Sequence, residues 1–385
     1  MIPGLDGLRA IAILLVFAYH TRFIEVGWVG VQLFFVLSGF LITGILLKMK
    51  ESLPPGKYFG KFYGRRFLRI FPLYYFYLTL MAIVARRLIA MDFHPRYLQS
   101  FYDQVWPAVF YVYDLFYRTV SFQQSYFLDH FWSLSVEEQF YITWPLLILL
   151  VPQKYLKHLC ISFIILGPVF RLLLFLLYIS GSSLWIFREP FALVIYSWPL
   201  SHLDAFAFGA YISRYSIPYP KQQLFISVLL IPIIGFSATY LASSGIQPIS
   251  ALGYDMPLRA GYQFIWSHSL LNYFFAVLIY CVVYERVLLW VLEMPWLSYL
   301  GRISYGMYVY HFPLIWFVGA LLKPQIEGDV ANWVKIVVSL LATILAATLS
   351  YYLLEKPILN LKDRFFMWSQ DKDRAIASKF LRRAP

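Results

Sequence analysis

An arginine and a histidine, Arg9 and His20, enclose ten mostly apolar residues close to the N-terminus. In a helix that turns about 100° per residue, the steps between them add up to three turns and about 20°, so both side chains lie on one face. They are roughly 16 Å apart along the axis, whereas a hydrocarbon core is about 30 Å thick. With Arg9 at the inner boundary of a membrane, His20 is expected inside it, where ionisable groups are costly and usually functional.

The chemistry that suits such a histidine is general-base catalysis, because an imidazole pKa of about 6.5 allows proton transfer at neutral pH. A structural hydrogen bond to a neighbouring helix fits the spacing of His20 equally well. For Arg9, anchoring of the helix at the lipid headgroups is the simpler interpretation. The spacing alone leaves both roles of His20 open.

Composition places these residues in a membrane protein. Of 385 residues, 61% are hydrophobic and 14% charged, whereas a soluble domain carries about 25% charged residues. Apolar runs near the length of a membrane span recur along the whole chain, so we predict an all-α, polytopic transmembrane helix bundle with about ten spanning helices. The predicted spans are 8–24, 29–48, 67–89, 131–151, 156–179, 190–214, 222–243, 265–287, 299–322 and 332–354.

The distribution of charge gives the orientation. A net charge of +12 could suggest a nucleic-acid partner, but Lys and Arg cluster in loops that helical hairpins place on one side, as the positive-inside rule requires. The richest segments are 48–69 and 356–383, so both termini are predicted to be cytoplasmic. Residues 1–355 would form the transmembrane domain and 356–385 a basic cytoplasmic tail. If segment 104–120 also spanned the membrane, the basic tail would lie on the outer side, against the charge rule. We therefore expect this segment to lie flat or re-entrant on the outer face.

A metal centre is not expected. The two cysteines, Cys160 and Cys281, both lie in apolar runs and show no metal-type spacing. A zinc site and a disulfide framework are therefore not predicted.

A series of motifs resembles the acyltransferase-3 family of integral membrane proteins, in order from Leu5 to Pro357. They are the Arg9–His20 pair, "GVQLFFVLSGFLI" (30–42), "RRFLRIFPLYY" (65–75), "HFWSLSVEEQFYITWP" (130–145), "SHLDAFAFGA" (201–210), "GRISYGMYVYHFPL" (301–314) and "EKP" (355–357). The resemblance implies an acyl-CoA donor, a carbohydrate or glycolipid acceptor and a place in the lipid bilayer of the bacterial inner membrane. Some relatives carry a fused esterase-like domain, and this chain is expected to be the form without one.

The resemblance makes His20 the preferred base. The glutamate of the family's most distinctive motif corresponds to Glu137, which is expected to orient that imidazole and stabilise its charged form. His130 is the second candidate base, with an interfacial hydrogen-bonding role as its alternative. Ser135 and Glu138 fit a capping box at the start of a helix.

The basic residues at the start of "RRFLRIFPLYY" (65–75) are the candidates for binding the donor. Arg65, Arg66 and Arg69 could simply anchor the inner boundary, or, together with Arg9, bind the phosphates of CoA through charge-assisted hydrogen bonds. In the second case, a pantetheine arm would carry the thioester from this boundary to His20.

Two further residues are candidates for substrate contact. Ser38 belongs, with Gly30 and Gly39, to the small residues of one predicted helix, which are better explained by close helix packing, although the Ser38 hydroxyl could donate to substrate or to the developing oxyanion. Asp204 lies in an apolar run and requires a partner. Relatives tend to carry arginine two residues earlier, where this chain has His202, so a family-type ion pair is not implied. His311 is expected to form a structural hydrogen bond.

The expected activity is transfer of an acyl group, most simply acetyl, from cytoplasmic acyl-CoA to a sugar hydroxyl of a cell-surface or exported glycan. The alternative is a transporter or flippase for a glycan or small solute, whose signature would be broken helices in corresponding positions of two halves. Acylation of a small metabolite at the inner face is a third possibility, which the long outer loop 90–130 disfavours.

Overall fold

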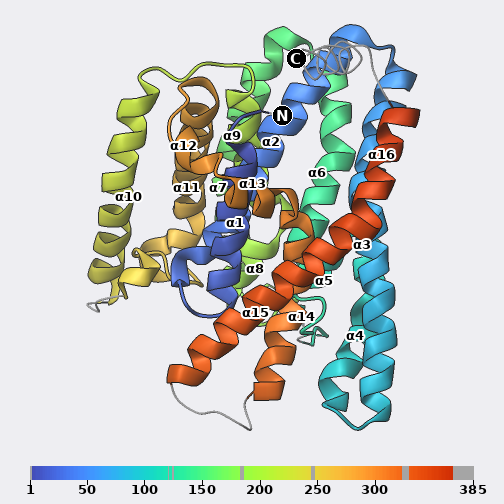
Figure 1. Cartoon of the computed structure of the whole chain (residues 1–385). Coiled ribbons are helices and arrows are strands. Elements are labelled where there is room, and N and C mark those ends of the chain that lie inside the picture. The colour runs from blue at the N-terminus through green and yellow to red at the C-terminus, as the bar shows by residue number, and fades with distance from the viewer. Residues whose placement is uncertain are drawn as a thin grey trace.

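The computed structural model describes residues 2–119, 121–123, 125–182, 186–243, 248–322 and 329–366. Over these residues the chain is a bundle of helices (Figure 1), and its extended structure is limited to one bridge between Thr119 and Phe187. The predicted all-α fold is confirmed. The predicted tail beyond residue 366 lies outside the described residues.

The helices follow the chain in the order shown in Figure 1. They are α1 (Leu5–His20), α2 (Val29–Ser52), α3 (Pro55–Ala90), α4 (Pro95–Val109), α5 (Tyr113–Phe116), α6 (Phe131–Leu150), α7 (Leu156–Ile179), α8 (Phe191–Ser197), α9 (Leu203–Ile212), α10 (Pro220–Ser243), α11 (Gln263–Tyr284), α12 (Leu289–Leu292), α13 (Pro295–Arg302), α14 (Ser304–Leu322), α15 (Asp329–Ser350) and α16 (Lys356–Phe365).

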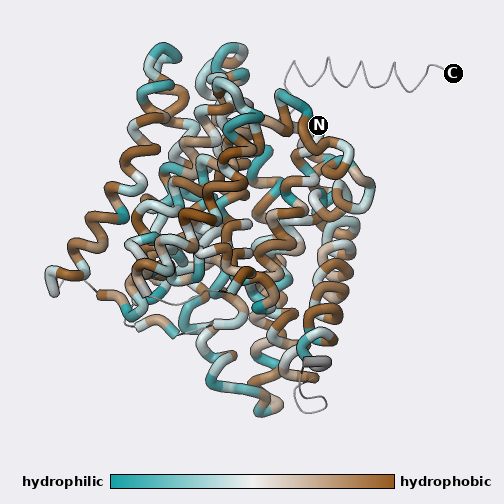
Figure 2. Tube along the Cα trace, turned by 90° about the vertical axis from the view of Figure 1, so that its left-hand side faces the viewer, coloured by the Kyte–Doolittle hydropathy of each residue, from teal (hydrophilic) through white to brown (hydrophobic). Residues whose placement is uncertain are grey.

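Seven helical segments of the described chain are long and apolar enough to cross a membrane, and a bent pair would make an eighth if it counts as one span. The predicted count of ten is therefore not confirmed. One reason is the length of α1, whose 16 residues extend about 24 Å at 1.5 Å per residue. Figure 2 shows hydrophobic stretches along the outer helices, as a lipid-facing surface requires.

The predicted span 190–214 is broken in the structure. The segment Phe191–Ser197 and the segment Pro199–Ile212 differ in direction by 71°. Trp198 between them has extended backbone angles, φ −73° and ψ 137°, because a proline excludes the helical conformation from the residue before it. The predicted span 299–322 is likewise divided, since α13 ends at Arg302 and α14 begins at Ser304.

Small residues let the central helices approach one another closely. A Cβ added to Gly30 would lie 2.3 Å from the carbonyl oxygen of Ala12, and one added to Gly39 would lie 2.1 Å from that of Phe206. Helix α2 is therefore held between α1 and α9 at a separation that any larger side chain would increase.

The loops that carry most of the basic residues lie at one end of the bundle. The α2–α3, α6–α7 and α9–α10 connections all lie at the top of Figure 1, as does the end of α16. This arrangement agrees with the hairpin topology used to predict the orientation. The helical chain does not end at the "EKP" motif, since it continues as α16, which packs on α3. Glu355 of this motif is buried.

Segment 104–120 is not one helix. It comprises the end of α4, a turn and the single-turn α5. Helix α4 packs on α3, where the Tyr74 hydroxyl donates to the carbonyl oxygen of Ala108 at 2.6 Å. Asp114 in α5 is buried and accepts a hydrogen bond from Gln139 of α6. The segment is thus part of the bundle wall, and its position relative to the membrane stays a prediction.

Candidate functional site

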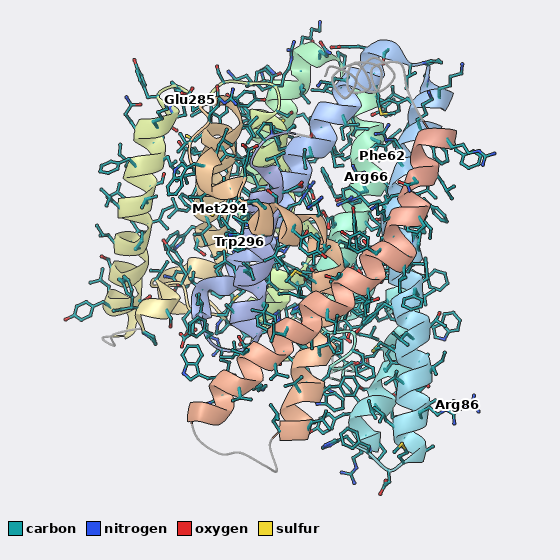
Figure 3. All side chains as sticks on the ribbon, in the orientation of Figure 1. Phe62, Arg66, Arg86, Glu285, Met294 and Trp296 are labelled. Carbon is teal, nitrogen blue, oxygen red and sulfur yellow. The ribbon has the colours of Figure 1, made fainter. Side chains whose placement is uncertain are left out.

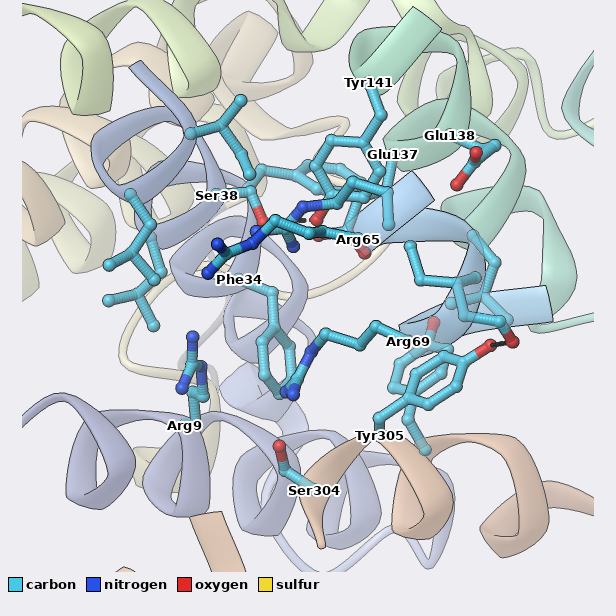
Figure 4. Close-up of a pocket in the computed structure, with 18 of the residues that line it drawn as sticks. Arg9, Phe34, Ser38, Arg65, Arg69, Glu137, Glu138, Tyr141, Ser304 and Tyr305 are labelled. Carbon is cyan, nitrogen blue, oxygen red and sulfur yellow. Dashed lines mark hydrogen bonds between the residues drawn. The ribbon is translucent and has the colours of Figure 1, made fainter. Parts of the chain in front are cut away.

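One cavity of the described chain is lined by arginines, and we call it the basic cavity (Figure 4). It has a volume of about 290 Å³ and is formed mainly by α1, α2, α3, α6 and α14. Its polar lining residues are Arg9, Ser38, Arg65, Arg66, Arg69, Ser133, Glu137, Glu138, Tyr141, Ser304, Tyr305 and Tyr308.

All four predicted donor-binding arginines line this cavity. Figure 4 shows the guanidinium groups of Arg9, Arg65 and Arg69 directed toward the same space. Arg66 lies beside Phe62 on α3 (Figure 3) and over the ring of Tyr141, 5.3 Å from its centroid. Helix α1 places Arg9 beside the arginines of α3, so the four side chains form one cationic surface. Arg9 also forms an ion pair with Asp6 at 2.9 Å.

Glu137 lines the basic cavity, and its carboxylate makes its hydrogen bonds there and not with the imidazole of His20. Its Oε1 accepts hydrogen bonds from the hydroxyls of Ser38 and Tyr141. His20 lines a different cavity, so the expectation that Glu137 orients this histidine is not supported by the geometry. The carboxylate instead lies among the arginines, where it offsets part of their charge, and Ser38 contacts it from α2.

The predicted capping box is wrong. Helix α6 begins at Phe131, and its N-cap residue, His130, makes no side-chain capping bond. Ser135 is therefore inside the helix, where its hydroxyl accepts the backbone N–H of Tyr113 at 3.3 Å. Glu138 is buried along the basic cavity instead of capping the helix.

The second cavity contains the histidine, and we call it the histidine cavity. Its volume is about 550 Å³. It is lined by Val16, Tyr19, His20, Arg22, Glu25, Trp28, Val31, Tyr117, Arg118, Asp129, His130, Trp132, Leu193, Tyr196, Asp255, Met256, Tyr308 and Phe312. The imidazole therefore faces a space that is lined by aromatic rings and charged groups.

A chain of hydrogen bonds assigns the proton on His20. Nδ1 of His311 lies 2.6 Å from the carbonyl oxygen of Tyr308 and must donate to it, since a carbonyl only accepts. Nε2 of a neutral His311 is then an acceptor, and it lies 3.2 Å from Nδ1 of His20. Nδ1 of His20 therefore carries the proton, which it shares with the carbonyl oxygen of Val16 at 2.9 Å. Nε2 of His20 keeps its lone pair, as a general base requires.

His130 is placed less favourably for catalysis. Its Nε2 lies 3.1 Å from the carbonyl oxygen of Val309 and donates to it, so the lone pair is on Nδ1. That atom is buried without a hydrogen-bond partner among the described residues. The ring lines the histidine cavity, but its basic nitrogen is not accessible from it.

His311 was expected to be structural, and it is the residue that holds His20. It is fully buried on α14, and 291 residues separate the two histidines. A pairing at that separation leaves no local pattern in the sequence.

Asp204 lines neither cavity. Its carboxylate accepts hydrogen bonds from Arg171 at 3.2 and 2.9 Å, and from the Ser269 hydroxyl at 2.6 Å. Both charged side chains of the pair are fully buried. Asp204 therefore ties α9 to α7 and α11, and the prediction of substrate contact is not supported. The available signal was Arg171, a charged residue within the apolar run of α7.

The two cavities meet at a shared wall. Among the described residues, Val31 of α2 and Tyr308 of α14 are the residues that line both. The four predicted donor-binding arginines line the cavity on one side of this wall, and His20 lines the cavity on the other.

Metal ligands do not gather in the described part of the chain, where groups of three or more His, Cys, Asp or Glu with metal-binding geometry are absent. Cys160 and Cys281 are both buried and free.

Comparison with known proteins gives matches along most of the chain. A family model described as an acyltransferase domain matches residues 2–352. The peptidoglycan O-acetyltransferase OatA of Listeria monocytogenes is 30% identical, over 93% of this chain and 56% of its own length. The putative peptidoglycan O-acetyltransferase YrhL of Bacillus subtilis is 31% identical over 93% and 55%, and the O-acetyltransferase OatA of Staphylococcus aureus 28% over 93% and 57%. The chain thus spans just over half the length of these relatives. No solved structure matches it significantly.

Proposed function

Because the chain belongs to the acyltransferase-3 family, we propose that it is a membrane O-acyltransferase acting on a glycan. It would move an acyl group, most simply acetyl, from cytoplasmic acyl-CoA to a sugar hydroxyl of a cell-surface or exported polymer. The observation that carries the proposal is the placement of four arginines and a histidine with an assigned lone pair on opposite sides of one wall.

The basic cavity supports the donor assignment. CoA carries several phosphates, and arginine binds phosphate through paired, charge-assisted hydrogen bonds. Arg66 lies in the part of α3 nearer the end of the bundle where the basic loops gather (Figure 3), and Arg65 and Arg69 lie within one turn of it on the same helix. In the predicted orientation this end faces the cytoplasm, where acyl-CoA is available. The pantetheine arm would then extend along the cavity toward the wall.

The histidine cavity supports a carbohydrate acceptor. Trp28, Trp132 and Tyr196 supply aromatic faces of the kind on which sugar rings stack. Glu25 and Asp255 supply carboxylates that can accept hydrogen bonds from sugar hydroxyls. Both kinds of group lie around the imidazole, so a bound sugar can present a hydroxyl to it.

The reaction follows from the tautomer of His20. Nε2 takes the proton of the acceptor hydroxyl as its oxygen attacks the acyl carbon. The new C–O bond forms, the C–S bond of the thioester breaks, and the CoA thiolate takes the proton from the imidazolium, which leaves the base as it began. While the imidazolium exists, its Nδ1–H points at the lone pair of His311 Nε2, which stabilises the charge.

The test is acyl transfer by purified protein. The relatives from Listeria and Bacillus are named peptidoglycan O-acetyltransferases, so peptidoglycan oligosaccharide is the first acceptor to offer with radiolabelled acetyl-CoA. We expect release of the CoA thiol that depends on acceptor, with label recovered as an alkali-labile ester. The break between α8 and α9 would also suit a transporter. Solute uptake into vesicles without thiol release under any acceptor would favour transport and contradict the proposal.

A further inference from the structure

The wall between the two cavities consists of Tyr308, whose side chain is held by hydrogen bonds, and Val31, whose side chain can form none. The Tyr308 hydroxyl is bonded to the hydroxyl of Ser133 and donates to the carbonyl oxygen of His130 at 3.2 Å. Its ring also meets that of Phe34 edge to face, at a centroid distance of 6.3 Å. Three contacts therefore fix the tyrosine. Val31 is buried and can contribute only its two methyl groups.

The position of the wall decides what reaches it. In the proposed function, the charged part of CoA binds the arginines of the basic cavity, and the base lies on the other side of the wall. A general base must come within hydrogen-bond reach of the hydroxyl whose proton it takes. The hydroxyl is therefore on the histidine side while it attacks, and the acyl carbon must meet it between Val31 and Tyr308.

We propose that the acyl group lies between Val31 and Tyr308 during transfer, and that the size of Val31 limits the length of the acyl chain. This inference rests on the proposed function. An acetyl group brings a single methyl to the wall, and each further methylene must be placed against a side chain that is already packed. Discrimination by one methylene in an apolar site is about 10–200-fold in kcat/KM.

Shortening or lengthening this side chain tests the inference. Rates of thiol release are measured with acetyl-, propionyl- and butyryl-CoA and a fixed acceptor. In Val31→Ala, we expect the ratio of butyryl to acetyl transfer, taken as kcat/KM, to rise at least about tenfold over the unmodified protein. In Val31→Leu, the ratio of propionyl to acetyl transfer should fall by a similar factor.

A matched control is available on the same helix. Val29 is buried on α2 and lines neither cavity, so Val29→Ala removes the same atoms without touching the wall. The acyl-chain ratio should be unchanged in this variant. Equilibrium binding of CoA, which the proposed function assigns to the arginines and not to the wall, reports whether each variant is folded.

The outcomes separate the two proposals. If the unmodified protein transfers acetyl but both Val31 variants keep its acyl-chain ratios while binding CoA normally, the inference about the wall is refuted and the proposed function stands. An equal change of ratio in Val29→Ala would also refute it, since the effect would then be general loosening of α2. If the unmodified protein releases no thiol from any acyl-CoA, the proposed function fails, and the inference fails with it.

Discussion

Replacement of His311 tests the chain of hydrogen bonds that assigns the base. In His311→Leu, Nδ1 of His20 keeps the carbonyl oxygen of Val16 at 2.9 Å, so the tautomer with a bare Nε2 is retained. The variant loses Nε2 of His311, the acceptor 3.2 Å from Nδ1 of His20. This atom accepts a hydrogen bond from a neutral imidazole in the ground state and from an imidazolium once the proton has moved to Nε2 of His20. His311 is thus a positioning residue, and its removal should lower kcat without abolishing it.

The size of the effect follows from the difference between the two states. A hydrogen bond contributes about 0.5–1.5 kcal/mol between neutral groups and about 1.5–3 kcal/mol when one group is charged. The differential contribution is therefore about 1–1.5 kcal/mol, which corresponds to a kcat lower by about 5- to 13-fold. The KM for acyl-CoA should be unchanged, because the arginines are on the other side of the wall.

A conservative variant separates positioning from packing. In His311→Gln, the amide can still donate to the carbonyl oxygen of Tyr308 and accept from His20, so we expect most of the lost kcat to return. The assay is the initial rate of thiol release from acetyl-CoA by purified protein, with thermal unfolding in detergent to compare stability. Wild-type kcat in a stable His311→Leu variant would refute the reasoning. So would equal kcat in the leucine and glutamine variants.

Three further predictions follow from the site and the bundle. In His20→Ala, turnover should fall by about 10²–10⁴-fold, the usual loss for a general base, while CoA binding persists; near-normal turnover would remove the assignment. In Arg69→Ala, the KM for acyl-CoA should rise more than kcat falls, whereas Lys57→Ala, an exposed cation on the same helix, should alter neither; the reverse pattern would mean that Arg69 does not bind the donor. In Arg171→Ala, removal of one buried charge should destabilise the protein by about 3–5 kcal/mol, measured by unfolding in detergent. The double variant Arg171→Met with Asp204→Leu should recover most of that stability. Failure to do so would show that the loss is not due to an unpaired charge.

Local patterns predicted the helical bundle and the cationic surface. The run around Arg65 and Arg69 is contiguous, so its side chains had to lie together, and Arg9 shares their depth at the end of a predicted helix. The break at Trp198 was also readable, since a proline follows it and excludes the helical conformation. Apolar composition, on which the predicted span 190–214 rests, does not contain this signal.

Pairings between distant helices could not be predicted from one sequence. Whether a carboxylate at Glu137 meets an imidazole or an arginine depends on how α6 is rotated relative to α1 and α2, and spacing along one helix does not fix that rotation. The same limit applies to His311, whose contact with His20 joins α14 to α1. Asp204 has the partner that its place in an apolar run requires, but this partner, Arg171, lies on α7, outside the motifs that carry the family resemblance.

The buried pair of Arg171 and Asp204 has a consequence for biogenesis. On insertion scales, one Arg or Asp at the centre of a helix costs about 2.5–3.5 kcal/mol. Helix α7 is synthesised before α9, so its arginine enters the translocon with no counter-charge yet available. We expect α7 to remain at the insertion machinery until α9 emerges, and the two to pass into lipid together.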